Sequence, residues 1–424
     1  MKLLIKGARV IDPVNGKDEI LDVLIDAGKI LKVDKKIQAQ AEEVIDAQGK
    51  IVMPGLVDMH VHLREPGRED KETIVSGTKA AAKGGVTSLL AMPNTNPAID
   101  SPERVIGLKK IIKQDSRVNV FIAGAITIGR LGRELTDIAA LKKEGTLAIT
   151  DDGSSVDDEE VMRKAFRIGA KEGLLVICHC EDKSLSKEGV VNLGFTSTRM
   201  GLRGISKESE YLRVARDLRL AAQEEARIHI AHVSCRESVE LIAEAKKKGV
   251  KVSAETAPHY FSLSEEAVLG FDTNMKMNPP LRSKSDLASI AQALKDGVID
   301  VISSDHAPHT ESEKDIEFER AEFGVIGLET ELSVGITYLV DTGILSWSRL
   351  IECMSSFPAR ILGINKGALT PGQDADIIIV SPEKDWVAER KDFISKSKNS
   401  PFMGRKLKGV VEAAILKGQV IYKR

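Results

Sequence analysis

The most regular feature of this sequence is an alternation, between residues 51 and 305, of short apolar runs and longer amphipathic stretches. The apolar runs are rich in β-branched residues and end in polar ones, which is typical of buried parallel strands. The stretches between them carry apolar residues at three- and four-residue spacing, which predicts helices. The runs are GLVDMHVHL, GVTSLLAMPNT, VNVFIAGAIT, TLAITDDG, LLVICHCED, RIHIAHVS, KVSAETAPHY and VIDVISSDHAPH.

Eight strands that are each followed by a helix predict an α/β fold of the (β/α)8 TIM-barrel type. An open, doubly wound sheet uses a similar alternation and is the alternative. The Gly-rich phosphate-binding turn that would favour it is missing after the first strand. We therefore expect a barrel domain over residues 51–365.

The two ends of the chain have a different pattern, with short strands separated by Gly, Asp and Asn turns. The first segment reads LLIKGARVIDP, ILDVLIDAGKILKV and EEVIDAQGKIVMP, and the last reads GALTPGQDADIIIV and GVVEAAILKGQVIYKR. This pattern predicts antiparallel β-structure. We expect both termini, residues 1–50 and 366–424, to meet in a small β-sandwich domain beside the barrel.

Composition narrows the classes of function. A length of 424 residues fits one large barrel with an accessory domain, and a net charge of −2 offers no basic face to nucleic acid. Apolar stretches stay below the ~18 residues of a membrane span. Four cysteines are too few for a disulfide framework in a chain of this length. The sequence predicts a cytoplasmic protein that binds neither nucleic acid nor membranes and acts on a small molecule.

Candidate chemistry gathers at the strand ends, where a barrel of this type builds its active site. The first strand ends in His60 and His62. Residues two apart share a face of a strand with Cα atoms ~6.6 Å apart, so two imidazoles can converge on one ion. Later strands end in further residues able to bind a metal: Asp151, Asp152, His179, His232 and Asp305.

Each of these residues alone has an ordinary structural explanation. A His-x-His pair can arise by chance, a strand-end aspartate often caps a helix, and a buried histidine often donates a structural hydrogen bond. The joint pattern predicts a divalent metal site, most naturally zinc. Strand alternation turns His229 and His306 away from that site, whereas His309 lies beyond the strand, where alternation has no force.

These motifs resemble those of the cyclic amidohydrolases, and most closely those of the bacterial class I dihydroorotases, over the whole chain. The resemblance rests on DMHVHLREPG, AMPNTNPAID, TDDGSSVDD, HCED, HIAHVS, ETAPHY, MNPPLRS, and SDHAPH with GLET. The final GALTPGQDADIIIV is similar to the composite β domain of the family. The resemblance implies reversible hydrolysis of (S)-dihydroorotate to N-carbamoyl-L-aspartate, a step of pyrimidine synthesis.

The resemblance also implies an active site with one or two Zn2+ ions. His60 and His62 match the ligands of one zinc, which Asp305 completes while it serves as the proton shuttle. His179 and His232 match the ligands of a second position.

The bridging ligand departs from many relatives, which use a carbamylated lysine at the end of the fourth strand. Here the nearby lysines, Lys142 and Lys143, precede that strand and belong to the opposite end of the barrel. Asp152, or alternatively Asp151, takes that place, as in the aspartate-bearing branch of the class.

Arg64 lies two residues beyond His62, on the same side of the strand by alternation, where a guanidinium can hold a carboxylate through two hydrogen bonds. The alternative for Arg64 is a surface salt bridge with Glu65 or Glu69. The resemblance implies that four side chains bind dihydroorotate, three at its carboxylate and the last at its ring: Arg64, Asn94, His309 and Asn278.

Two other functions compete with this interpretation. A dihydropyrimidinase or allantoinase would share the fold, but its substrate lacks the carboxylate that Arg64 would bind. A silent relative that serves as a structural partner of aspartate transcarbamoylase would have lost metal ligands, which this sequence keeps. The charged segment 306–329 contains too few apolar residues to order itself strongly, so we expect a homo-oligomer or aspartate transcarbamoylase to pack on it.

Overall fold

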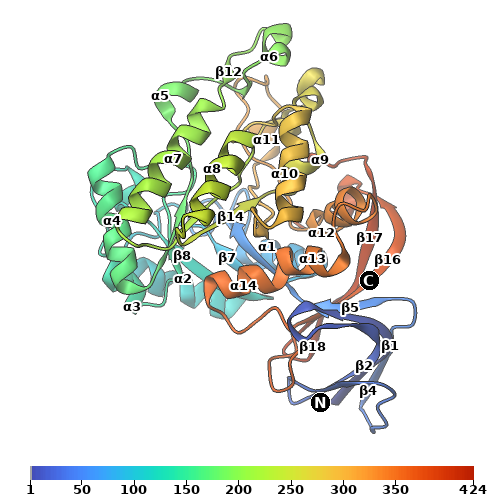
Figure 1. The fold of residues 1–424 in the computed structure, drawn as a ribbon. Coiled ribbons are helices and arrows are strands. Elements are labelled where there is room, and N and C mark those ends of the chain that lie inside the picture. Colours follow the sequence, from blue (N-terminus) through green and yellow to red (C-terminus); the bar gives the residue numbers. More distant parts are fainter. Residues whose placement is uncertain (1) are drawn as a thin grey trace.

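A computed structural model describes residues 2–424, in which a helix-covered barrel lies beside a β-sheet built from both ends of the chain (Figure 1). Figure 1 shows β1 and β2 in blue at the N-terminus and β16 and β17 in red near the C-terminus. Among the described helices, none has the length and apolar character that a membrane span requires.

The barrel confirms the predicted alternation, because each of the predicted strands contains one strand of the structure. Within residues 2–424 its sheet has eight strands, hydrogen-bonded in sequence order: β6 (Leu56–Val61), β7 (Val86–Ala91), β8 (Asn119–Gly124), β9 (Ala148–Ile149), β10 (Leu175–Cys178), β13 (Ile228–Ile230), β14 (Val252–Thr256) and β15 (Val301–Ile302). The neighbouring strands are parallel. The ring closes where Val61 bridges His306 and the His62 amide donates to the His306 carbonyl at 2.9 Å.

Helices follow the strands, as a (β/α)8 fold requires. The helices that directly precede the next barrel strand are α1 (Ile74–Gly84), α2 (Pro102–Asp115), α3 (Ile138–Lys143), α4 (Glu159–Glu172), α7 (Glu208–Gln223), α8 (Arg236–Lys247) and α10 (Lys284–Asp296). After β15 come α11 (Glu311–Lys314), α12 (Glu331–Gly335), η5 (Ile336–Val340), α13 (Trp347–Ile351), η6 (Glu352–Ser356) and α14 (Phe357–Leu362).

Local sequence sets the ends of these helices. The Thr73 side chain accepts from the Ser76 amide and starts α1, and Gly85, at φ 90°, ends it. A capping box between Ser283 and Asp286 starts α10, and Gly297 ends it with φ 77°. Both helices start well beyond the strands that precede them, β6 and β14, so residues 62–73 and 257–283 form connections on the mouth side of the barrel.

Shorter elements extend the loops on the mouth side. Between β10 and α7 lie α5 (Lys183–Ser186), β11 (Val191–Asn192), α6 (Phe195–Met200) and β12 (Gly204–Ile205), which project at the top of Figure 1. The β8–β9 connection contains η2 (Ile128–Arg130), and the β14–α10 connection contains α9 (Pro258–Ser262), η3 (Glu265–Gly270) and η4 (Thr273–Met275).

The two termini share one β domain. Its strands and short turns are β1 (Lys2–Asp12), η1 (Pro13–Asn15), β2 (Lys17–Asp26), β3 (Lys29–Asp34), β4 (Glu43–Asp46), β5 (Ile51–Pro54), β16 (Ile377–Val387), η7 (Arg390–Asp392), β17 (Lys406–Leu416) and β18 (Gln419–Lys423). The hydrogen-bonded order is β18-β17-β16-β5-β1-β2-β3, with β4 also on β1. Residues from both ends, including Leu3, Val23, Ile377 and Ile415, pack in one core.

This sheet differs from the expected one in two details. The expectation of antiparallel structure is wrong for the pairs of β1 with β4 and β5, which are parallel. In addition, residues 51–54 pair with β16 and so belong to the terminal sheet. Gly55 makes the passage into the barrel, where a Cβ atom would lie 2.1 Å from Thr87 Oγ1. We propose Gly55 as the domain boundary, with the second near residue 366.

The segment 306–329 is packed by its own chain. The Lys276 ammonium donates to the Phe318 and Glu319 carbonyls, both at 2.9 Å. Lys314, itself buried, donates to the Glu322 carbonyl at 2.8 Å and the Gly324 carbonyl at 3.0 Å. The expectation that this segment cannot order itself strongly is therefore wrong, because buried lysines satisfy its backbone where apolar residues are scarce.

Candidate active site

The first histidine of the opening motif lies at the centre of the barrel mouth. His60 is fully buried, and its Nδ1 atom lies 2.6 Å from Glu255 Oε1 at the end of β14. Its Nε2 atom lies 3.2 Å from Asp152 Oδ1 and 3.5 Å from Asp305 Oδ1. Because a carboxylate holds a proton on Nδ1, Nε2 is the atom that faces the other carboxylates and that a neutral His60 would offer to a cation.

The second histidine is oriented in the same way by an amide. His62 Nδ1 lies 2.7 Å from Asn94 Oδ1 after β7. Its Nε2 atom lies 3.3 Å from Asp305 Oδ1 and 3.4 Å from Asp152 Oδ2. Asn94, expected at the substrate, thus also fixes the ring of a candidate ligand.

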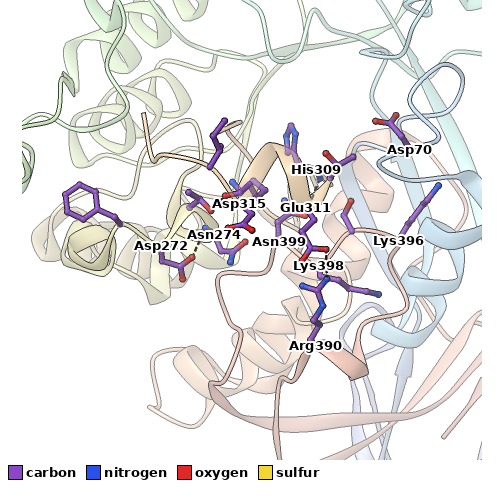
Figure 2. A pocket seen from close by; sticks show the side chains of 16 residues that line it. Asp70, Asp272, Asn274, His309, Glu311, Asp315, Arg390, Lys396, Lys398 and Asn399 are labelled. Carbon is purple, nitrogen blue, oxygen red and sulfur yellow. Dashed lines mark hydrogen bonds and ion pairs between the residues drawn. The ribbon is translucent and has the colours of Figure 1, made fainter. Parts of the chain in front are cut away.

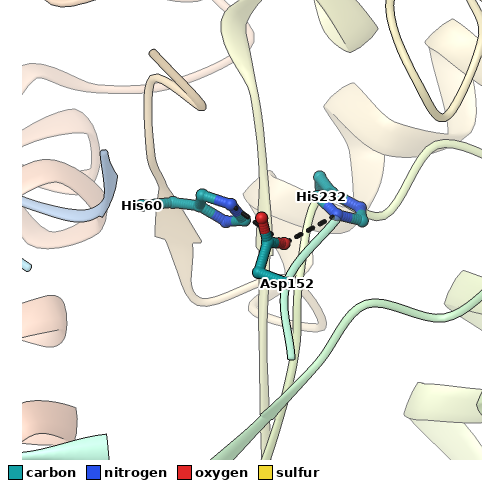
Figure 3. A group of neighbouring side chains, drawn as sticks. All are labelled: His60, Asp152 and His232. Atoms are coloured by element: carbon teal, nitrogen blue, oxygen red, sulfur yellow. Dashed lines mark ion pairs between the residues drawn. The ribbon is translucent and has the colours of Figure 1, made fainter. Parts of the chain in front are cut away.

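The neighbouring aspartates after β9 point in different directions. Asp152 Oδ1 lies 3.6 Å from His179 Nδ1 and 3.7 Å from His232 Nε2, and Figure 3 shows its carboxylate between His60 and His232. Asp151 instead accepts hydrogen bonds from the Ile126 and Thr127 amides and the Thr127 hydroxyl. Of the two alternatives, Asp152 is therefore the one that faces the histidines.

The remaining pair of histidines comes from β10 and β13. His179 Nδ1 and His232 Nε2 lie 2.7 Å apart. On its other side, His179 Nε2 lies 3.5 Å from Glu181 Oε2. Burial raises the pKa of Glu181, but hydrogen bonds and charge from His179, with hydrogen bonds from Ser186 and Asn278, lower it to about 2. The expected ring contact, Asn278, thus lies beside Glu181.

These side chains fit a divalent cation. The structure contains two groups of three side chains, and within each group the possible ligand atoms all lie within 4.8 Å of one another. The groups are His60, Asp152 and His232, and His60, His62 and Asp305. Among the described residues, His60 Nε2 and Asp152 Oδ1 are buried without a hydrogen-bond partner. An unsatisfied buried polar atom costs about 1–3 kcal/mol. A cation between them would remove that cost, so the donor set fits a metal.

The electrostatics of the cluster also favour added positive charge. Burial acts to lower the pKa of His60, but Asp152, Asp305 and Glu255 together raise it well above its usual value. For Asp305, burial acts to raise the pKa, but His60 and His62 lower it below its usual value. The carboxylates are therefore ionised at neutral pH and hold either a proton or a cation between the imidazoles.

Three of the expected site residues adopt a left-handed backbone conformation that non-glycine residues seldom take. The φ angles are 63° for Arg64, 37° for His232 and 47° for Asp305. Such conformations cost roughly 1–3 kcal/mol each and cluster at functional sites. All three lie two or three residues beyond the end of a barrel strand, so the strain accompanies the turn that aims each side chain at the mouth.

Arg64 lies beside His309, as the resemblance implies. Its Nε atom donates to the Pro308 carbonyl at 3.1 Å, and its Nη2 atom lies 3.3 Å from His309 Nε2. Burial lowers the pKa of Arg64 to about 10, while Asp305 and other carboxylates act to raise it. Glu65 accepts a hydrogen bond from the Ile74 amide, and Glu69 accepts one from the Gly67 amide, so both bind elsewhere.

A cavity of about 650 Å³ meets this cluster at His309. Figure 2 shows its polar walls, which come from the segments around Asn274, Glu311 and Lys398. His309 is the expected substrate residue on these walls. The other expected substrate residues, Arg64, Asn94 and Asn278, do not line it.

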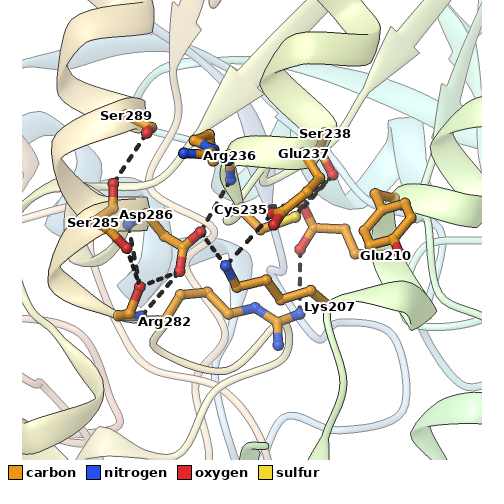
Figure 4. Close-up of polar contacts among 12 residues, drawn as sticks. Lys207, Glu210, Cys235, Arg236, Glu237, Ser238, Arg282, Ser285, Asp286 and Ser289 are labelled. Atoms are coloured by element: carbon orange, nitrogen blue, oxygen red, sulfur yellow. Dashed lines mark hydrogen bonds and ion pairs between the residues drawn. The ribbon is translucent and has the colours of Figure 1, made fainter. Parts of the chain in front are cut away.

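A buried polar network supports the far side of the site (Figure 4). Arg282 donates to Ser234 Oγ at 3.1 Å and lies 3.4 Å from Glu210 Oε2, and Glu210 also accepts from the Ser234 amide at 3.0 Å. Ser234 follows His232 by two residues, and Arg282 follows Asn278 by four. The network thus ties a candidate ligand to the loop of the expected ring contact.

Sequence reasoning missed several residues that shape the site. Glu255 lies between His60 and His229, whose Nε2 atom is 3.2 Å from Glu255 Oε2. Arg130 donates to the Asp152 carbonyl at 2.7 Å and so holds the aspartate turn. Glu255 could have been found from its place at the end of the predicted seventh strand, whereas Arg130 lies in a loop without any periodic signal. His306 turns away to Glu72, at 3.3 Å.

Comparison with known proteins relates the whole chain to one family. The family model described as "Dihydro-orotase-like" matches residues 49–238. The dihydroorotase of Elusimicrobium minutum is 51% identical over 99% of this chain and 97% of its own length. That of Pelotomaculum thermopropionicum is 50% identical over 99% and 98%, and that of Geobacter metallireducens is 49% identical over 100% of both chains.

Solved structures share the fold at lower identity. The L-hydantoinase (dihydropyrimidinase) from Arthrobacter aurescens superposes with a TM-score of 0.91 at 27% identity, covering 99% of this chain and 96% of its own. A D-hydantoinase superposes with a TM-score of 0.87 at 26% identity, covering 100% and 96%. Both the barrel and the terminal sheet therefore have counterparts among cyclic amide hydrolases.

Proposed function

The chain belongs to the dihydroorotase family, and on that premise we propose that this site catalyses the reversible hydrolysis of (S)-dihydroorotate to N-carbamoyl-L-aspartate. The observation that carries the proposal is the pairing, at one barrel mouth, of the buried histidine and carboxylate cluster with the cationic Arg64 and its neighbour His309. The cluster supplies hydrolytic chemistry, and the cation recognises the carboxylate of the substrate.

We propose Zn2+, as one or two ions, for the cluster. The ligands would be His60, His62, Asp152, His179, His232 and Asp305. Imidazole nitrogens and carboxylate oxygens are ligands that zinc accepts. When bound, such a cation polarises the carbonyl under attack and lowers the pKa of a water molecule.

The chain's own residues perform the remaining steps. Asp305 is ionised between His60 and His62, so it can accept the proton of the attacking water. The bond between the carbonyl carbon and the ring nitrogen then breaks, and Asp305 returns the proton to that nitrogen. Arg64 and Asn94 hold the substrate in place, which makes the attack effectively intramolecular.

The charge beside the metal cluster favours this substrate over a neutral cyclic amide. A hydantoin or dihydropyrimidine ring lacks the carboxylate that would meet Arg64, so it offers the guanidinium no charged hydrogen-bond partner. Lys71, which is also buried, lies within 3.1 Å of His309 and adds a second cation. The same cluster that binds dihydroorotate therefore disfavours neutral rings.

Arg64→Met should leave the metal content unchanged and reduce kcat/KM for dihydroorotate by about tenfold to a hundredfold. A hydrogen bond to a charged group contributes about 1.5–3 kcal/mol, and methionine keeps the length of the side chain without its charge. Steady-state kinetics with dihydroorotate and with dihydrouracil, which lacks the carboxylate, measure the effect. An equal loss for both substrates would remove Arg64 from carboxylate recognition.

A further inference from the structure

The buried cation beside His309 has contacts that do more than add positive charge to the substrate site. Lys71, which precedes α1, is 5% exposed, and its Nζ atom lies 3.1 Å from His309 Nδ1. Glu313 Oε1 lies 2.9 Å from the same Nζ atom. The lysine therefore stands behind His309, on the side of the ring opposite Arg64.

The contact with Lys71 decides which nitrogen of His309 carries the proton. An ammonium group has three donors and no acceptor, so His309 Nδ1 must accept and the imidazole proton resides on Nε2. The ring itself is neutral, because burial, and then the charges of Arg64 and Lys71, lower the pKa of His309 to about 2. His309 thus presents one N–H group, at Nε2.

That N–H group and Arg64 then converge as two donors. Arg64 Nη2 lies 3.3 Å from His309 Nε2, and two N–H groups cannot satisfy each other. An acceptor that lies against both nitrogens satisfies both. A carboxylate, with two oxygens and four lone-pair sites, matches this arrangement.

The opposite tautomer would close the site. Glu313 Oε2 lies 3.4 Å from His309 Nδ1 and could accept a proton there. His309 Nε2 would then accept from Arg64, and the guanidinium would be occupied before any substrate arrived. Lys71 opposes this state, since it donates to Nδ1 and also pairs with Glu313.

We propose that Lys71 is a positioning residue that fixes His309 as a donor at Nε2 and thereby makes the Arg64 and His309 pair selective for a carboxylated ring. The inference deepens the proposed function and rests on it for the identity of the carboxylate. The tautomer itself is a property of the protein and can be measured without turnover.

The tautomer is tested directly by ¹⁵N NMR of zinc-loaded protein labelled at histidine, with His309→Gln to assign the resonances. We expect Nε2 of His309 to be protonated and Nδ1 to be an acceptor in the wild type. In Lys71→Met, the proton should move at least partly to Nδ1. A wild-type ring protonated at Nδ1 would overturn the proposal, whatever the activity of the protein.

Kinetics test the consequence for the substrate. Lys71→Met should raise KM for dihydroorotate by about tenfold, the lower end of the effect of a charged hydrogen bond, and leave kcat within about threefold. Lys71→Arg, which keeps a charged donor, should bring KM for dihydroorotate most of the way back to the wild-type value. Arg68→Met is the matched control, since Arg68 donates to the same Glu313 oxygen at 2.8 Å and makes its other contact with Asp70.

The outcomes separate the two proposals. An equal rise in KM for Arg68→Met and Lys71→Met would mean that Glu313 alone matters, and would refute the role of Lys71. A loss confined to kcat would refute it as well. A wild-type protein that fails to hydrolyse dihydroorotate would contradict the proposed function, while the NMR result for His309 would still decide the tautomer.

Discussion

His60→Ala is expected to abolish both metal binding and dihydroorotate hydrolysis. His60 belongs to both groups of candidate ligands, and its Nε2 atom is one of the buried atoms without a hydrogen-bond partner within residues 2–424. Its removal takes one ligand from each group, so the metal is lost. Without a cation to polarise the carbonyl under attack, turnover should fall on the order of a thousandfold or more. Metal analysis of the purified variant and an assay at saturating substrate measure the two effects.

A suitable control is His306→Gln, which changes a buried histidine next to Asp305 whose ring contacts Glu72 and the Gly327 amide. This variant should retain the metal content of the wild type, because its side chain faces away from the cluster. Full metal occupancy with normal turnover in His60→Ala would remove the basis of the proposed site.

Asp152→Asn should lose most of the metal and of the activity, whereas Asp151→Asn should keep both. The two residues are adjacent, but Asp152 faces the histidines, while Asp151 accepts from the Ile126 and Thr127 amides. Asparagine retains an acceptor oxygen for those amides and removes the negative charge that a cation needs. The pair is compared by metal stoichiometry and kcat/KM, and the reverse ranking would make Asp151 the ligand.

We expect the same aspartate to make the site independent of carbon dioxide. A carboxylate with an unperturbed pKa of about 3.9 is ionised at neutral pH without chemical modification. Burial acts to raise the pKa of Asp152, but His60, His179 and His232 lower it well below its usual value. Metal-stripped protein should therefore recover activity with zinc alone, and its intact mass should match the unmodified chain. A strict bicarbonate requirement would point to a lysine ligand elsewhere.

The barrel and much of the candidate site follow from periodicity. Apolar runs predicted all the barrel strands, even though β9 and β15 are only two residues long in the structure. The polar residues that end those runs are the ones that meet at the mouth, because parallel strands carry their ends to one face. Strand alternation also turned His306 away from the site, where it contacts Glu72.

The residues that sequence missed act through contacts between distant segments. Lys71 and His309 are 238 positions apart, and His60 and Glu255 are 195 positions apart. No local period encodes such a pair. The segment 306–329 was misjudged for a related reason, because Lys276 and Lys314 look like surface residues in the sequence yet are buried as donors to its carbonyls.

The most direct test of the account is a dihydroorotate hydrolysis assay on purified wild-type protein whose metal content has been measured in the same sample. The account predicts turnover that rises with zinc occupancy, disappears on chelation and returns with zinc alone. It also predicts a much higher kcat/KM for dihydroorotate than for dihydrouracil. A fully zinc-loaded protein that leaves dihydroorotate intact, or that prefers the neutral ring, would contradict it.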